Sequence, residues 1–178
     1  MSDQSAAAGG TLATGIWRLD PARSSVEFHV RHFYGLMTVK GRFDRFEGSL
    51  DLSRDPAISL VVDADSLDTK NKQRDKHLRS EDFFDVGNHP EVRFEAEPAS
   101  VSLDGPKPHV RGTLEAAGKL VPVDVEATIT PAGEEFEIEA TASVDHRELG
   151  MTWSPLGILR APSKLVVHGR LTRGESAD

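Results

Sequence analysis

Residues 24–33 read SSVEFHVRHF, and apolar side chains alternate there with polar ones. In an extended chain, Val26, Phe28 and Val30 fall on one face, and the polar residues between them fall on the other. A period of two over this length is typical of a half-buried β-strand in an antiparallel sheet. The segment therefore predicts a strand whose apolar face points toward a core.

The same alternation returns along the rest of the chain. It is seen in PAISLVVDADS at 56–66, PEVRFEAEPAS at 90–100, VPVDVEATIT at 121–130, EEFEIEATASVD at 134–145 and KLVVHGRL at 164–171. Turn-forming pairs such as Asp55-Pro56 and Ala117-Gly118 separate these segments. We therefore expect an all-β fold of about eight antiparallel strands, arranged as a closed barrel or a sandwich.

One segment breaks the alternation. Residues 69–84 read TKNKQRDKHLRSEDFF, with neither a period of two nor a turn pair. Asp68 or Thr69 can cap a short helix here, and Ser80 can cap a second turn. We expect one short helical segment around residues 69–84, which would seal one end of the barrel with Leu78, Phe83 and Phe84.

Composition restricts the classes of function. The chain has 178 residues, a formal net charge of -8 and no cysteine, which argues against nucleic-acid binding and excludes disulfides and thiolate chemistry. Residues 1–14 look like a disordered polar tail without a secretory signal, and no apolar run reaches the roughly 18 residues of a membrane span. We expect a cytoplasmic protein.

The densest chemistry lies in RDKHLRSEDFFD, residues 74–85. The seven histidines are scattered singly and lack metal-ligand spacing, so we predict no metal site; they are His29, His32, His77, His89, His109, His146 and His168. Carboxylates beside arginines tend to stay ionised, which suits ion pairs more than proton transfer. We interpret the segment as a charged helix held to the barrel rim by arginine–carboxylate pairs, and not as an active site.

Several segments resemble the YceI-like, polyisoprenoid-binding family. RDKHLRSEDFFD followed by NHPEVRF is similar to the family signature, and IWRLDPARSSVEFHVRH resembles its opening strand. GRFDRFEGSL, RGTLEAAGKLVPVDV and RELGMTWSP match further elements, so the resemblance covers residues 15–173 and leaves 174–178 as a C-terminal tail. The chain departs from the family where it has Ala117-Gly118 in place of a common His-Gly pair, and Leu120 in place of a common Thr.

The resemblance implies a lipocalin-like extended antiparallel β-barrel. It also implies a ligand, an isoprenoid quinone or other polyprenyl lipid held inside the barrel, with no covalent cofactor. Family members are often dimers, so a homodimer is expected here, for which Leu36 and Met37 could supply the contact. The leading hypothesis is therefore a carrier protein that is not an enzyme.

The candidate ligand-binding residues come from the inward strand faces and the matched segments. They are Val26, Phe28, Val30, His32, Phe43, Phe46, Leu60, Val62, Phe94, Leu114, Phe136, Ile138, Ala140, Ala142 and Trp153. Small residues on these faces leave room that bulkier side chains would fill. The residues alone favour a dry, packed core over a cavity, and the resemblance reverses that preference.

Two further hypotheses stay open. One is an enzyme that acts on an apolar substrate in the same cavity, with His32, Asp145 and Arg147 as its polar groups. The other is a packed barrel that serves as a protein-interaction module. The apolar loops at 33–37 and 150–159 are consistent with either a cavity mouth or an interface.

Overall fold

The computed structural model describes residues 12–32, 36–97, 101–102, 107–153 and 159–174. The described strands are β1 (Ile16–Leu19), β2 (Ser25–His32), β3 (Met37–Phe43), β4 (Phe46–Asp51), β5 (Ala57–Asp63), β6 (Leu67–Asp68), β7 (Glu91–Ala96), β8 (Val101–Ser102), β9 (His109–Ala116), β10 (Lys119–Ala132), β11 (Glu135–Val144) and β12 (Leu159–Arg173). Two 3₁₀ turns, η1 (Pro21–Arg23) and η3 (Ala64–Ser66), and the helix α1 (Lys72–Leu78) complete the described elements.

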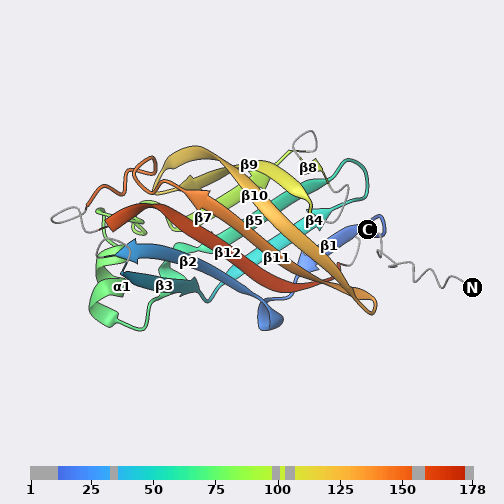
Figure 1. The fold of residues 1–178 in the computed structure, drawn as a ribbon, viewed down its shortest axis with the longest axis horizontal. Coiled ribbons are helices and arrows are strands. Elements are labelled where there is room, and N and C mark those ends of the chain that lie inside the picture. The colour runs from blue at the N-terminus through green and yellow to red at the C-terminus, as the bar shows by residue number, and fades with distance from the viewer. Residues whose placement is uncertain (1–11, 33–35, 98–100, 103–106, 154–158, 175–178) are drawn as a thin grey trace, which may run out of the picture.

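Eight of these strands form a closed antiparallel ring, in the order β1–β4–β5–β7–β9–β10–β11–β12, which returns to β1 (Figure 1). The ring closes where Trp17 and Leu19 of β1 pair with Arg173 and Leu171 of β12. The expected all-β barrel of about eight strands with one short helix is confirmed.

The wall is built differently at its two ends. β12 is long, so it pairs with β1 near its C-terminus and with β2 from Leu159 to His168. β3 pairs with β2 on one side, and on its other side it pairs only with the two residues of β6. Beyond β3 the chain continues through η3 and β6 to α1, which lies at the left of Figure 1, away from the described chain ends. We call this the helix end, and the opposite one the terminus end.

The predicted alternation sets which side chains face the barrel interior. Val26 and Phe28 of β2 are buried, and so are Phe136 and Val144 at the two ends of β11. The β9–β10 turn places Ala117 and Gly118 at φ 48° and 73°, the geometry of a two-residue hairpin turn. The sequence pattern thus identified both the inward faces and this turn.

The helical segment differs from the prediction at its boundaries. α1 spans only Lys72–Leu78, and its N-cap is Asn71, whose side chain accepts a hydrogen bond from the Arg74 N–H. Ser80 does not cap a second turn, because its hydroxyl donates to the His77 carbonyl instead. The two residues that were predicted to cap the helix make other contacts: Thr69 donates to Asp75, and Asp68 pairs with Lys70.

The arginines of this segment hold it to the barrel mainly through backbone oxygens. Arg79 donates to the carbonyls of Asp65 and Leu67 at 2.8 Å, and also pairs with the Asp65 carboxylate at 2.9 Å. Arg74 donates to the Thr69 hydroxyl and carbonyl, also at 2.8 Å. The helix is therefore attached where it was expected, but carboxylates are the minor partners, because open turns leave carbonyls unpaired within reach of the guanidinium groups.

Candidate functional site

Two cavities lie inside the barrel. The first, which we call the barrel cavity, has a volume of about 170 Å³ and is bounded almost wholly by apolar atoms. All eight strands of the closed ring and β2 contribute to its lining, among them Leu19, Val26, Leu60, Phe94, Ala140 and Leu171. It is thus the interior of the closed barrel itself, left open because the inward side chains do not fill it.

The second cavity, about 260 Å³, lies between the barrel and α1, and we call it the helix-end cavity. Phe28, Leu78, Phe83 and Phe84 line it, so the aromatic side chains predicted to seal this end form its wall. Phe84 lies edge-on to Phe28 and to Phe43, with ring centroids 5.9 and 5.7 Å apart.

A narrow waist separates the two cavities. Four residues line both of them: Phe43, Val92, Leu114 and Leu165. They come from β3, β7, β9 and β12, so the waist surrounds the barrel axis on several sides. The two cavities therefore adjoin each other at this level of the barrel.

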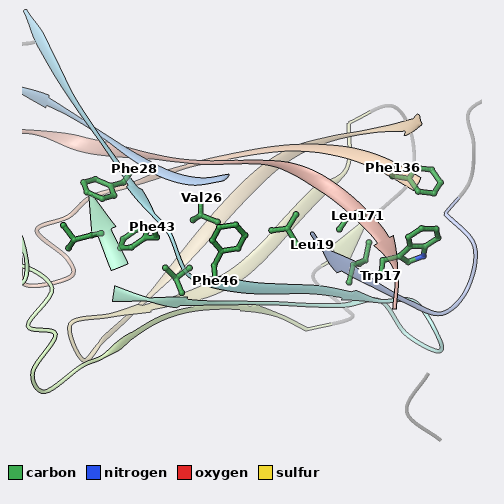
Figure 2. Packing of buried hydrophobic residues seen from close by; sticks show 11 residues of the cluster. Trp17, Leu19, Val26, Phe28, Phe43, Phe46, Phe136 and Leu171 are labelled. Atoms are coloured by element: carbon green, nitrogen blue, oxygen red, sulfur yellow. The ribbon is translucent and has the colours of Figure 1, made fainter. Parts of the chain in front are cut away.

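The terminus end is packed shut. Trp17 and Phe136 lie edge to face with ring centroids 5.1 Å apart (Figure 2). The Arg173 guanidinium lies over the Trp17 ring, 5.6 Å from its centroid. The Trp17 indole N–H donates to the Ala13 carbonyl at 3.0 Å. Figure 2 places Phe28 and Phe43 at the other end of the same buried cluster. Access to the interior is therefore expected from the helix end.

The helix end also exposes large apolar side chains. Leu36 is 87 % exposed, Met37 59 % and Trp153 43 %. Met37 and Trp153 also line the helix-end cavity, which places them at its mouth. The rest of the two predicted apolar loops, residues 33–35 and 154–158, lies outside the described residues.

The structure distributes the candidate residues over both cavities and the packed end. Nine line the barrel cavity: Val26, Phe43, Leu60, Val62, Phe94, Leu114, Ile138, Ala140 and Ala142. Phe28, Val30 and Trp153 line the helix-end cavity. Phe46 and Phe136 belong to the packed cluster and line neither cavity, and the His32 side chain lies outside the described part of the chain.

Sequence reasoning missed the polar groups of the helix-end cavity. Arg74, His77, His146 and Ser163 all line it. His146 and Ser163 are both buried, and His146 Nδ1 lies 3.0 Å from Ser163 Oγ. A single histidine between Asp145 and Arg147 gives no periodic signal, so the sequence offered no means of singling it out.

Two of the three polar groups named for the enzyme hypothesis lie outside both cavities, and the third, the His32 side chain, lies outside the described part of the chain. Asp145 and Arg147 pair with each other on the surface, and neither lines the barrel cavity or the helix-end cavity. The hydrogen bond from Arg147 lowers the pKa of the Asp145 carboxyl to about 2, which keeps it ionised and unsuited to proton transfer at neutral pH. Among the described residues, no group of three or more His, Asp or Glu side chains is placed to hold a metal ion.

The closed antiparallel barrel surrounds an apolar cavity. The protein therefore belongs to the class of small β-barrels whose interior has room for a ligand. Residues 17–169 match the family model of the YceI-like domain, and the chain belongs to this family. No helix in the described part of the chain is long and apolar enough to span a membrane.

Curated relatives agree with this assignment over part of their length. A UPF0312 protein of Vibrio parahaemolyticus is 36% identical over 118 residues, which cover 64% of this chain and 61% of the relative. A UPF0312 protein of Pseudomonas paraeruginosa is 32% identical over 114 residues, 62% of this chain and 58% of the relative. The matches thus span about three fifths of these proteins.

Solved structures share the fold at low sequence identity. BcnA of Burkholderia cenocepacia is 19% identical with a TM-score of 0.77, over 86% of this chain and 99% of that one. A polyisoprenoid-binding domain of Saccharophagus degradans is 13% identical with a TM-score of 0.70, over 91% and 100%. A YceI protein of Campylobacter jejuni is 19% identical with a TM-score of 0.67, over 79% and 88%.

Proposed function

We propose that this protein binds a long apolar lipid, a polyprenyl lipid or isoprenoid quinone, along the barrel interior, and acts as its carrier. The observation that supports this most is the barrel cavity, which is bounded almost wholly by apolar atoms yet is not filled by side chains. The Saccharophagus degradans domain of the same fold is described as polyisoprenoid-binding, which favours a prenyl chain over other apolar ligands.

The size and chemistry of the cavities suit a chain-like ligand. Each is smaller than the roughly 300 Å³ at which sites for drug-sized ligands begin. A lipid of several isoprene units would therefore occupy both cavities and pass through the waist. Each buried CH₂ group contributes about 0.8 kcal/mol, so such a chain binds without any hydrogen bond along its length.

The other hypotheses have less support. A packed interaction module would have a filled interior, and the two cavities argue against one. The enzyme hypothesis named Asp145 and Arg147, and these two residues pair with each other away from both cavities. The cytoplasmic location, the homodimer and the absence of a covalent cofactor stay predictions.

The direct test is organic extraction of the purified protein followed by mass spectrometry of the extract. The delipidated protein is then titrated with polyprenyl quinones of increasing chain length. Co-purified prenyl lipid, or tight binding on titration, supports the carrier. An empty extract together with no binding would leave the interaction module as the better hypothesis.

A waist variant tests whether the ligand passes between the cavities. Leu114→Trp places a large ring where the two cavities meet, and should weaken binding of a long-chain quinone at least tenfold. A quinone with one isoprene unit does not need to pass the waist and should lose much less affinity than the long-chain quinone. Glu115→Trp, on the exposed face of β9, is the matched control.

A further inference from the structure

The helix-end cavity differs from the barrel cavity in its polar lining. The barrel cavity presents almost only apolar atoms, whereas Arg74, His77, His146 and Ser163 all border the helix-end cavity. The two cavities share the waist, so one elongated ligand could meet an apolar environment at one end and hydrogen-bonding groups at the other. A site with this polarity suits an amphiphile better than a plain hydrocarbon.

His146 and Ser163 form the buried pair in this lining. They are 9% and 7% exposed, and His146 Nδ1 lies 3.0 Å from Ser163 Oγ. The backbone holds the ring in place, because the His146 carbonyl accepts from the N–H groups of Leu149 and Met151. Ser163 sits on β12 opposite Val144, the last residue of β11. The turn after β11 therefore fixes the backbone position of His146, and the β11–β12 register fixes that of Ser163.

One nitrogen of this histidine makes no hydrogen bond to the residues that the structure describes. Within the described part of the chain, no group is hydrogen-bonded to His146 Nε2, while Nδ1 is occupied by Ser163. Burial lowers the pKa of the His146 imidazole, which keeps the ring uncharged at neutral pH. A neutral imidazole uses one nitrogen as a donor and the other as an acceptor, and the serine hydroxyl can play either role. Nε2 can thus donate to a carbonyl or accept from a hydroxyl.

The other polar groups of the cavity are already engaged. Arg74 Nε and Nη2 both donate to Thr69, each at 2.8 Å. His77 Nε2 lies 2.9 Å from the Asp82 carboxylate. These Arg74 contacts are to neutral oxygens, so its guanidinium group stays a cation at the cavity wall, whereas the His146–Ser163 pair offers hydrogen bonds without a charge.

We propose that His146, oriented by Ser163, forms a head-group site for the uncharged oxygen of a prenyl lipid, a carbonyl or a hydroxyl. This inference rests on the proposed lipid-binding function and adds to it the orientation of the ligand, with its oxygen at the helix end and its chain in the barrel cavity.

Three probes with the same branched C20 skeleton test the site: geranylgeraniol, geranylgeranyl phosphate and phytane, the saturated hydrocarbon of that skeleton. Trp153 lines the cavity, so its fluorescence reports binding, and Trp17 at the packed terminus end is the only other tryptophan. Wild type should bind geranylgeraniol more tightly than phytane, because only the alcohol offers an oxygen to His146. His146→Phe should weaken geranylgeraniol binding about three- to tenfold, the value of one hydrogen bond, and leave phytane unchanged.

Ser163→Ala is a smaller change that should also weaken geranylgeraniol selectively, and it serves if His146→Phe folds poorly. His168→Phe and Ser143→Ala, both on exposed strand positions, are the matched controls. Equal geranylgeraniol binding by wild type, His146→Phe and Ser163→Ala would overturn the head-group site alone. Failure of all three probes to bind wild type would overturn the lipid-binding function, and the head-group site with it.

Discussion

The Phe28 ring occupies the space above Gly41, its register partner on the neighbouring strand β3. A Cβ atom placed on Gly41 would lie 2.1 Å from Phe28 Cζ, far inside van der Waals contact. Phe43 and Phe84 pack on the same ring, with centroids 5.4 and 5.9 Å away. Phe28 thus keeps its position in the helix-end cavity wall because the residue across from it has no side chain.

Gly41→Ala should therefore push the Phe28 ring out of its place and into the helix-end cavity. We expect a loss of about 1–3 kcal/mol in the free energy of unfolding, as for other overpacked sites, together with weaker lipid binding. Urea unfolding and quinone titration measure the two effects. Gly87→Ala, where an added Cβ meets nothing within 4 Å, should change neither. Unaltered stability of Gly41→Ala would mean that the ring is free to move.

Ala140→Phe distinguishes a cavity from a packed core. Ala140 lines the barrel cavity and pairs with Ala127, so two small side chains face each other across β10 and β11. A phenylalanine there should fill the space meant for lipid, and abolish binding while leaving the melting temperature of the lipid-free protein unchanged or raised. In a packed core the same change would cost about 1–3 kcal/mol.

Thermal unfolding of the delipidated proteins, beside a quinone titration, measures both quantities. Glu139→Phe, one position along β11 and facing outward, is the control that should keep binding. A clearly destabilised Ala140→Phe, combined with no binding by wild type, would count against the carrier.

Arg79→Ala should detach α1 from the barrel rim. The guanidinium group donates to the carbonyls of Asp65 and Leu67, which would lose a charged donor. We expect a loss of about 1–3 kcal/mol in the free energy of unfolding. Arg93→Ala removes an exposed ion pair with Glu91 and should cost less than about 1 kcal/mol. Chemical unfolding measures the difference, and equal effects of the two variants would show that Arg79 is not a structural anchor.

The buried His146 should make the fold sensitive to mild acid. Burial lowers its pKa, an effect that the Arg147 charge reinforces and the Asp145 charge opposes. The unfolded chain takes up the proton near the ordinary histidine pKa of about 6.5, and the folded protein does so only at lower pH. Between these two values the unfolded state binds more protons, so stability falls as the pH falls and is unaffected above the window.

His146→Gln should remove this component of the acid sensitivity. The measurement is the difference in unfolding free energy between wild type and variant, followed from neutral pH down to about pH 5. Contributions from surface carboxylates are the same in both proteins and cancel. His109→Gln, at an exposed position of β9, is the control. A difference that does not change with pH would contradict a buried neutral imidazole.

The exposed apolar residues at the helix end should matter for assembly. Leu36 and Met37 are 87% and 59% exposed, and the family resemblance implies a homodimer. Light scattering coupled to size-exclusion chromatography should give the mass of two chains for wild type and of one chain for Leu36→Glu. Leu120→Glu, at another exposed apolar position, is the control. A single-chain mass for wild type would end this prediction.

Much of the fold was accessible from the sequence, because strand alternation is a local property. The period of two around Val26 and Phe28, and from Phe136 to Val144, identified the inward faces without reference to any partner strand. The turn at Ala117 and Gly118 was equally local. The helix boundaries were less accessible, because Asn71, Asp68 and Thr69 can all cap a helix, and only the contacts of Thr69 with Asp75 and Arg74 decide among them.

What the tertiary structure alone decided is the shape and polarity of the interior. Barrel closure depends on Trp17 meeting Arg173, and the waist depends on residues from four strands arriving at one level of the barrel axis. His146 and Ser163 come together because the β11–β12 register sets Val144 opposite Ser163. The sequence by itself determined which side chains are inward, since each residue's face follows from its neighbours. Which inward side chains leave space between them depends on contacts across the barrel, and a local pattern holds no information about those.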